Sequence, residues 1–241
     1  SHSKKPFSIR EWFVLSTLAP SMNIKYDADE IPFSVKPEKK VSPEQMFAFY
    51  RETYEGTEYD QVKNLGVEVD RRKVENGETI SYKETVYPVS TFMPGDMRTL
   101  LNSIKPGVTE RIRTIAVIQC SYSHIMQCRD WLPDEIGGIL WFGVDDAATS
   151  CLTPIYSSGL RAPKCFEVGN GHLTQYSPTS AFWLFNRVAQ FAYLRYNLVA
   201  PEIQKAAADH ELGAMQIIPT VDAEALRLYK TKKPAEVKEY L

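Results

Sequence analysis

Residues that commonly carry redox or metal chemistry are scarce in this sequence. Its 241 residues include four cysteines and four histidines. Four scattered cysteines are too few for a disulfide framework in a chain this long, so we expect reduced and mostly buried thiols. Basic residues number 28 and acidic residues 30, which gives a net charge of −2. This balance lacks the positive surface that binds polyanions, and we expect no nucleic acid partner.

Long apolar runs are missing as well. No stretch approaches the roughly 18 consecutive apolar residues that a membrane span needs, and the opening "SHSKKPFSIR" lacks the apolar core of a signal peptide. We therefore expect no membrane partner. The compartment stays open, because any leader would precede this chain and both cytoplasmic and extracytoplasmic placements fit. Apolar residues, at 44%, still predict a sizeable core.

Nucleotide-binding and hydrolase motifs are absent too. The glycines of "GNGH" and "EIGGIL" have neither the lysine of a phosphate-binding loop nor the spacing of a dinucleotide-binding turn. No G-x-S-x-G nucleophile elbow occurs. We expect no metal and no organic cofactor.

The remaining patterns predict one α+β domain over residues 1–241. Pro20, Pro32 and Pro37 punctuate residues 1–40, which are expected to form an extended leading segment. A capped amphipathic helix is predicted at 42–56, where Ser42 is a good N-cap. The pattern weakens from 61 to 107, with a strand expected at 82–92 and a short helix at 96–104.

The second half of the chain has stronger patterns. Residues 111–122 are apolar on both faces, which is typical of a strand in the middle of a covered sheet. Residues 137–156 predict a second buried strand and a return strand that Pro154 places at an edge. A long apolar helix is predicted over 177–200, ended or kinked by Pro201. Further helices are expected after it, with Asp222 and Pro234 at their starts. This order of helix, strands and helices favours a layered α+β fold.

"CSYSHIMQCRDW" places His124 midway between Cys120 and Cys128. As a metal site it offers three ligands and no fourth, and on a strand these would spread over about 26 Å at roughly 3.3 Å per residue. As a catalytic pair, Cys128 and His124 would meet only if this turn were helical. The alternative is that both thiols are small packing residues, which is the commoner fate of a free cysteine.

Arg111 and Arg113 open the predicted strand at its polar end. A guanidinium there can face a cavity and bind a carboxylate through two parallel hydrogen bonds. The alternative is an ordinary solvated strand terminus.

Several blocks, taken together, resemble the carboxy-terminal half of the C69 family of dipeptidases. They are "REWFVLSTLAP", "PFSVKPEKKVSPEQMFAFYRETYEGTEYD", "ERIRTIAVIQCSYSHIMQCRDWLPDEIGGILWFGVDD" and "TSAFWLFNRVAQFAYLRY", which follow the order of the family between about Arg10 and Gly213. The resemblance implies an N-terminal nucleophile hydrolase, a four-layer αββα sandwich. In that family a cysteine at the mature amino terminus attacks the peptide carbonyl, with its own α-amine as the base.

The sequence departs from this pattern, because it begins "SHSKK" and has no cysteine before Cys120. We therefore expect the carboxy-terminal portion of a longer hydrolase, inactive alone, whose partners are a dipeptide substrate and the missing amino-terminal half. Ser1 as the nucleophile is the weaker alternative, because the residues after it do not form a buried-strand pattern. Arg111 is our candidate for the strand-borne arginine that, by analogy, orients the thiol and the substrate.

Two other functions remain open at this point. The chain could be a non-catalytic binding domain with the same fold, or a self-contained hydrolase that uses Cys128 and His124. If the amino-terminal half is missing, one apolar face of the sheet should be uncovered, and the chain could form a homo-oligomer through it.

Overall fold

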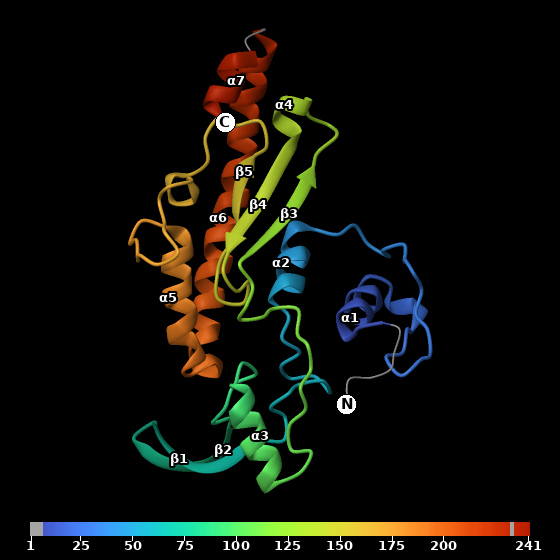
Figure 1. Ribbon diagram of the computed structural model, residues 1–241, viewed down its shortest axis with the longest axis vertical. Helices are drawn as coiled ribbons and strands as arrows, with labels where there is room; N and C mark the ends of the chain where they lie inside the picture. The colour runs from blue at the N-terminus through green and yellow to red at the C-terminus, as the bar shows by residue number, and fades with distance from the viewer. Residues whose placement is uncertain (1–6, 232–233) are drawn as a thin grey trace.

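The computed structural model describes residues 7–231 and 234–241, and Figure 1 shows their arrangement. The α-helices are α1 (Ile9–Leu18), α2 (Pro43–Arg51), α3 (Gly95–Ile104), α4 (Asp134–Gly137), α5 (Ala181–Tyr193), α6 (Tyr196–Lys230) and α7 (Pro234–Tyr240). Two short 3₁₀ helices are η1 (Pro20–Met22) and η2 (Lys164–Phe166). The strands are β1 (Val67–Glu75), β2 (Glu78–Val86), β3 (Tyr122–Cys128), β4 (Gly138–Val144) and β5 (Thr153–Tyr156). The predicted α+β class is confirmed.

A three-stranded antiparallel sheet in the order β3-β4-β5 forms the centre of the molecule. One face of this sheet is buried: Ile125 lies opposite Trp141 in the register, and both pack with Phe47 of α2. Methionine and isoleucine side chains of α6 pack against the same cluster, and α6 runs behind the sheet in Figure 1. The strand at 138–144 and the edge strand containing Pro154 were both predicted, and both are confirmed.

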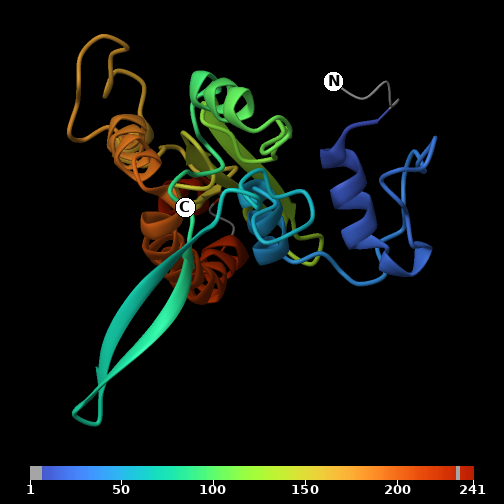
Figure 2. The same cartoon turned by 90° about the horizontal axis from the view of Figure 1, so that it is seen from below.

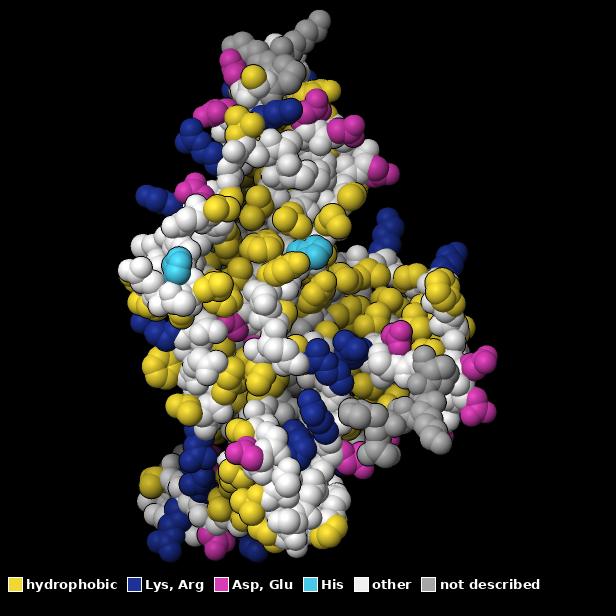
Figure 3. All heavy atoms as spheres, in the orientation of Figure 1, with side chains coloured by type: hydrophobic (Ala, Val, Ile, Leu, Met, Phe, Trp, Pro, Cys, Tyr) yellow, Lys and Arg dark blue, Asp and Glu magenta, His cyan; other side chains and the backbone are white. Residues whose placement is uncertain are grey.

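The other face of the sheet is covered only in part, where Phe166 of η2 packs edge-on against Phe142 with ring centroids 5.2 Å apart. Cross-strand register places His124 opposite Phe142 and Met126 opposite Leu140 on this side. Tyr122 is 59% exposed and Met126 is 74% exposed. We call the surface formed by Tyr122, His124, Met126, Leu140 and Phe142 the open face. Hydrophobic side chains gather over β3 to β5 on the side seen in Figure 3.

Two long helices follow the sheet, and their junction differs from the prediction. The apolar helix α5 ends at Tyr193, and the chain turns at Leu194 and Arg195 before α6 begins. Pro201 lies inside α6, so the break falls upstream of the proline. Tyr196, the first residue of α6, is buried, and its ring packs edge-on against Phe92 with ring centroids 4.7 Å apart.

The extended leading segment predicted for 1–40 is wrong over residues 9–18, which form α1. Ser8 and Glu11 make a capping box: the Ser8 hydroxyl accepts from the Glu11 N–H, and the Glu11 carboxylate accepts from the Ser8 N–H. The helix ends at Leu18, two residues before Pro20, and a helix commonly ends ahead of a proline. Residues 23–42 form no helix or strand.

The strand predicted at 111–122 is also wrong, because residues 111–121 form no strand and β3 begins at Tyr122. These residues form an irregular segment instead, and some of their apolar side chains pack into the core. Ala116 is buried beside Tyr196, and the N–H groups of Ile115 and Ala116 donate to the Glu52 carbonyl at 3.2 and 3.1 Å. Tertiary contacts here replaced the hydrogen bonds of a sheet.

The β1–β2 hairpin projects from the body of the molecule, as Figure 2 shows. Of the 18 residues in its two strands, 16 are exposed. Only its second strand was predicted, at 82–92, and the observed strand lies earlier, at Glu78–Val86. The helices predicted near 42–56 and 96–104 are confirmed as α2 and α3, and α7 starts at the predicted Pro234. Asp222 does not cap a helix and lies within α6.

Within residues 7–231 and 234–241, none of the helices combines the length and the apolar character that crossing a membrane requires.

Candidate functional site

The central stretch of the sequence, "CSYSHIMQCRDW", forms β3 and the connection that follows it. His124 and Cys128 are therefore four residues apart on a strand, about 13 Å at roughly 3.3 Å per residue. The hypothesis of a Cys128–His124 catalytic pair is wrong, because it requires a helical turn. Among the described residues, Cys120, His124 and Cys128 do not form a group that could hold a metal ion. The stretch is instead a strand that runs into a short connection.

All four cysteines are free, but the expectation that they are mostly buried is wrong, because Cys128 is exposed and the other three are partly buried. The Cys120 Sγ donates to the Tyr122 carbonyl at 3.3 Å and lies 3.7 Å from the Ser123 Oγ. Burial raises the pKa of the Cys151 thiol, and the nearby Glu211 carboxylate raises it further. Cys151 therefore stays protonated at neutral pH, which suits packing and not nucleophilic attack. The alternative nucleophile, Ser1, lies outside the described residues.

The loop after β4, residues 145–152, is the most polar part of the interior. Asp146 is fully buried; its Oδ1 accepts from the Ala148 N–H at 3.1 Å and its Oδ2 from the Tyr193 hydroxyl at 2.8 Å. Burial raises the pKa of this carboxyl, an effect that the two hydrogen bonds partly oppose. Asp145 adopts a left-handed backbone with φ 67° and accepts from the Asn186 amide at 2.9 Å. A polar turn was predicted here, but its burial was not.

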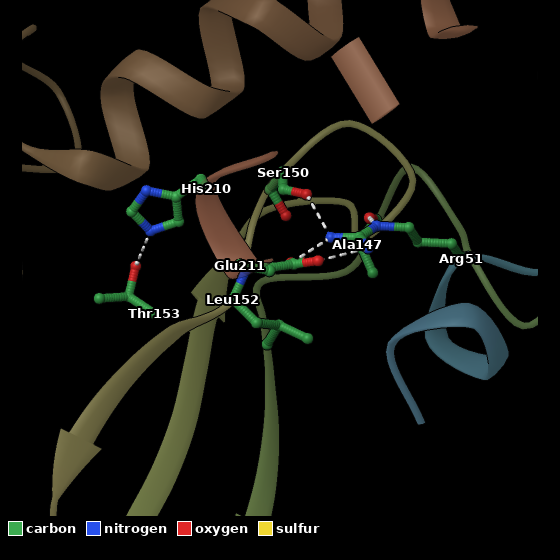
Figure 4. Close-up of polar contacts among 7 residues, drawn as sticks. All are labelled: Arg51, Ala147, Ser150, Leu152, Thr153, His210 and Glu211. Carbon is green, nitrogen blue, oxygen red and sulfur yellow. Dashed lines mark hydrogen bonds and ion pairs between the residues drawn. The ribbon is translucent and has the colours of Figure 1, made fainter. Parts of the chain in front are cut away.

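Two helices hold this loop through one ion pair, which Figure 4 shows. Arg51, at the end of α2, pairs with Glu211 of α6 through both of its terminal nitrogens. Its Nε donates to the Ala147 carbonyl at 3.2 Å and its Nη2 to the Ser150 carbonyl at 3.1 Å. Glu211, which is 2% exposed, also accepts from the Leu152 N–H at 2.8 Å. The pair thus satisfies buried groups at both ends of the loop.

The Arg51–Glu211 pair borders a cavity of about 570 Å³ between α2 and α6. Its other charged lining residues are all acidic: Glu44, Glu52, Glu55 and Asp209. Burial raises the pKa of Glu55, and the hydrogen bond from Thr53 acts in the opposite direction. This lining favours a cation over an anion.

A second buried ion pair closes the far end of the sheet. Arg129 pairs with Asp222 and donates to the Ile136 carbonyl at 2.7 Å. The other oxygen of Asp222 accepts from the Tyr156 hydroxyl at 2.7 Å. This explains why Asp222 lies inside a helix: its carboxylate links α6 to β5 and to the turn after β3.

Arg111 is the site residue predicted from the sequence, and the structure places it on an exposed irregular segment, so the expectation of a strand-borne arginine is wrong. Within the described part of the chain, Arg111 forms no ion pair with a carboxylate. The backbone just before it is held firmly. Arg98 of α3 donates through Nη1 to the Thr109 hydroxyl at 2.9 Å and to the Glu110 carbonyl at 2.8 Å.

The sequence did not indicate the partners in these networks. Arg51 and Glu211 are 160 residues apart, and Arg129 and Asp222 are 93 apart. No local spacing connects them. Arg51 lies in the last turn of its helix, where a basic residue is common, so its position gave no signal of a distant partner.

Comparisons with known proteins agree with the resemblance noted in the sequence. Residues 3–209 match the group of sequences described as Peptidase family C69. One relative, "Probable dipeptidase B" from Lactococcus lactis subsp. lactis (strain IL1403), is 25% identical over 112 residues, which are 44% of this chain and 23% of the relative. The match thus covers less than a quarter of that relative's length. Because the family match extends over most of the sequence, this chain belongs to peptidase family C69.

Proposed function

We propose that this chain is the carboxy-terminal part of a cysteine dipeptidase that hydrolyses short peptides. Membership of the C69 peptidase family supports this, as does the relative named as a probable dipeptidase. In the proposal, the nucleophilic cysteine belongs to polypeptide outside these 241 residues. The surroundings of Cys151 and the strand that separates His124 from Cys128 support that assignment.

The open face is the observation that carries the proposal. A sheet with one apolar side against helices and an apolar, partly exposed opposite side supports the packing of a second sheet there, as in a sheet-on-sheet sandwich. Tyr122, Met126 and Phe142 would then pack against a second sheet about 10 Å away. We propose that the second sheet, with the nucleophile at the start of one of its strands, completes an αββα sandwich on this face.

The reaction proposed for the complete enzyme proceeds through a covalent intermediate. The α-amine of the terminal cysteine takes the thiol proton, and the thiolate attacks the peptide carbonyl. The tetrahedral oxyanion is stabilised by hydrogen-bond donors. It collapses to a thioester as the proton passes to the leaving amine, and water then hydrolyses the thioester and restores the thiol. This chain would supply the supporting sheet, its helical layer and, through Arg111, a cation beside the substrate.

Active-site labelling tests this assignment. The product of the complete gene would be treated with a limiting amount of a thiol alkylator, and the modified peptide would be identified by mass spectrometry as dipeptide hydrolysis is lost. The proposal expects the label on a cysteine outside the 241 residues. Inactivation that follows labelling of Cys120, Cys128, Cys151 or Cys165 would refute it, and complete absence of hydrolysis would favour a binding domain.

A further inference from the structure

Arg98 contacts the backbone of the segment that carries Arg111, and the positive charge of Arg111 acts on Arg98. The two hydrogen bonds of Arg98 are to neutral acceptors, the Thr109 hydroxyl and the Glu110 carbonyl, at 2.9 and 2.8 Å. These place its guanidinium against the backbone immediately before Arg111. In the part of the chain that the structure describes, neither arginine forms an ion pair.

The segment that carries Arg111 is irregular but well fixed. The Thr109 hydroxyl donates to the Gln61 carbonyl at 2.8 Å, and the Gln61 side-chain oxygen accepts from the Ile112 N–H at 3.2 Å. The Asn102 amide nitrogen donates to the Thr109 carbonyl at 2.9 Å, while its oxygen accepts from the Thr109 N–H at 3.3 Å. Gln61 and Thr109 are buried. An irregular segment held by buried side chains is typical of a binding loop.

The two charges have an energetic cost that an anion would relieve. Partial burial lowers the pKa of Arg98, and the neighbouring charge of Arg111 lowers it further. Both effects disfavour the charged guanidinium, and no carboxylate is among the groups that act on it. A bound anion would remove the repulsion and supply the missing partner.

The segment that carries Arg111 precedes β3 in the chain: residues 112–121 lie between Arg111 and Tyr122, the first residue of β3. Several Lys and Arg side chains lie on the face of the molecule that also shows the hydrophobic surface over β3 to β5 (Figure 3).

We propose that Arg98 and Arg111 form a binding site for the terminal α-carboxylate of a short peptide. This inference rests on the proposed function, because it takes a dipeptide as the ligand. A carboxylate presents two oxygens in a plane, which match the paired N–H groups of a guanidinium. In a dipeptide this group lies one residue beyond the bond that is cleaved, so binding it also sets the register of the substrate.

Titration calorimetry with the 241-residue chain tests the site. The probes are alanyl-alanine and its carboxy-terminal amide, which differ in one charged group. We expect the free carboxylate to bind at least about tenfold more tightly, the usual effect of a hydrogen bond to a charged group. Arg111→Gln should remove this preference, and Arg111→Lys should keep only part of it, because lysine lacks the planar fork. Arg113→Gln is the matched control, since it removes the same charge two residues along the same exposed segment.

Arg98 needs a second control because it also holds the backbone of the loop. Arg98→Lys and Arg98→Gln would be compared by thermal unfolding before binding is measured. Equal binding of the two probes, no binding of either, or an unchanged preference in Arg111→Gln would each overturn the site. A role as ion-pair partner of a protein segment would appear as lower stability of the complete protein in Arg111→Gln, with no change in KM.

The two proposals can fail separately. If the complete gene product hydrolyses dipeptides while this chain shows no preference for the carboxylate, the arginine site is wrong and the peptidase stands. If the preference is present but the complete product has no hydrolytic activity, the site stands as a peptide-binding site and the peptidase is wrong.

Discussion

Single residues inside this protein carry charges that other residues must neutralise, and Glu211 is the clearest case. Replacing Glu211 with Gln should lower the free energy of unfolding by about 3 kcal/mol, because Arg51 would be left charged and mostly buried without its partner. Urea unfolding measures the change. The matched control is Glu224→Gln, on the same helix, whose partner Arg227 is exposed. Similar losses in the two variants would contradict the account.

Asp146 predicts a dependence of stability on pH. Its pKa is raised by burial, so the folded protein holds this proton more tightly than the unfolded chain does. The protonated Asp146 carboxyl therefore contributes its full share to folding stability below its pKa in the unfolded chain, which is about 3.9. This contribution is lost as the pH rises through its pKa in the folded protein. Asp146→Asn removes this titration while keeping the oxygen that accepts from Ala148.

The expected result is that Asp146→Asn gains stability relative to the wild type as the pH increases from about 3 to 7. Urea unfolding at a series of pH values provides the comparison. Asp209→Asn, at an exposed position on α6, serves as the control. A difference between wild type and Asp146→Asn that stays constant over this range would show that the buried carboxyl does not titrate as described.

At the scale of elements, a glutamate substitution should have little effect on stability on one face of β3 and a large effect on the other. Met126 lies on the open face and its neighbour Ile125 on the buried face. Met126→Glu should change the free energy of unfolding by less than about 0.5 kcal/mol and should reduce self-association and dye binding. Ile125→Glu should cost more than about 4 kcal/mol, because it buries an unpaired charge.

Sedimentation and dye fluorescence provide the readouts for the open face. A wild-type chain that is monomeric and binds no apolar dye would contradict the exposure of this surface. So would an equal loss of stability in Met126→Glu and Ile125→Glu, because it would mean that both faces are covered.

Elements with their own start and stop signals could be predicted from the sequence. The Ser42 cap and Pro43 define α2, and the apolar run of β4 and the proline of β5 identify those strands. The prediction failed where tertiary contacts determine the local conformation of the backbone. Residues 111–121 have the composition of a strand, but Glu52 and Tyr196 hold them as an irregular segment. In α1, the capping box outweighed the prolines that follow.

The candidate site was less predictable than the fold. Arg111 was identified as a possible carboxylate ligand, but its neighbour Arg98 comes from a separate helix, and no sequence spacing connects the two. The same holds for Arg51 and Glu211, which meet only because α2 and α6 pack on the same side of the sheet. Interactions between residues far apart in the chain depend on this packing, and local patterns do not encode it.

At the scale of the whole molecule, the partly exposed side of the sheet and the family membership support the proposal that this chain supplies one layer of helices and one sheet of a cysteine dipeptidase. Its central claim is that the catalytic thiol is not among these residues. Hydrolysis of a mixed dipeptide pool, measured for the 241-residue chain and for the complete gene product with and without a thiol alkylator, tests this most directly. The account predicts turnover by the complete product alone, abolished by alkylation. Alkylation-sensitive turnover by the 241-residue chain would contradict it and place the nucleophile among Cys120, Cys128, Cys151 and Cys165.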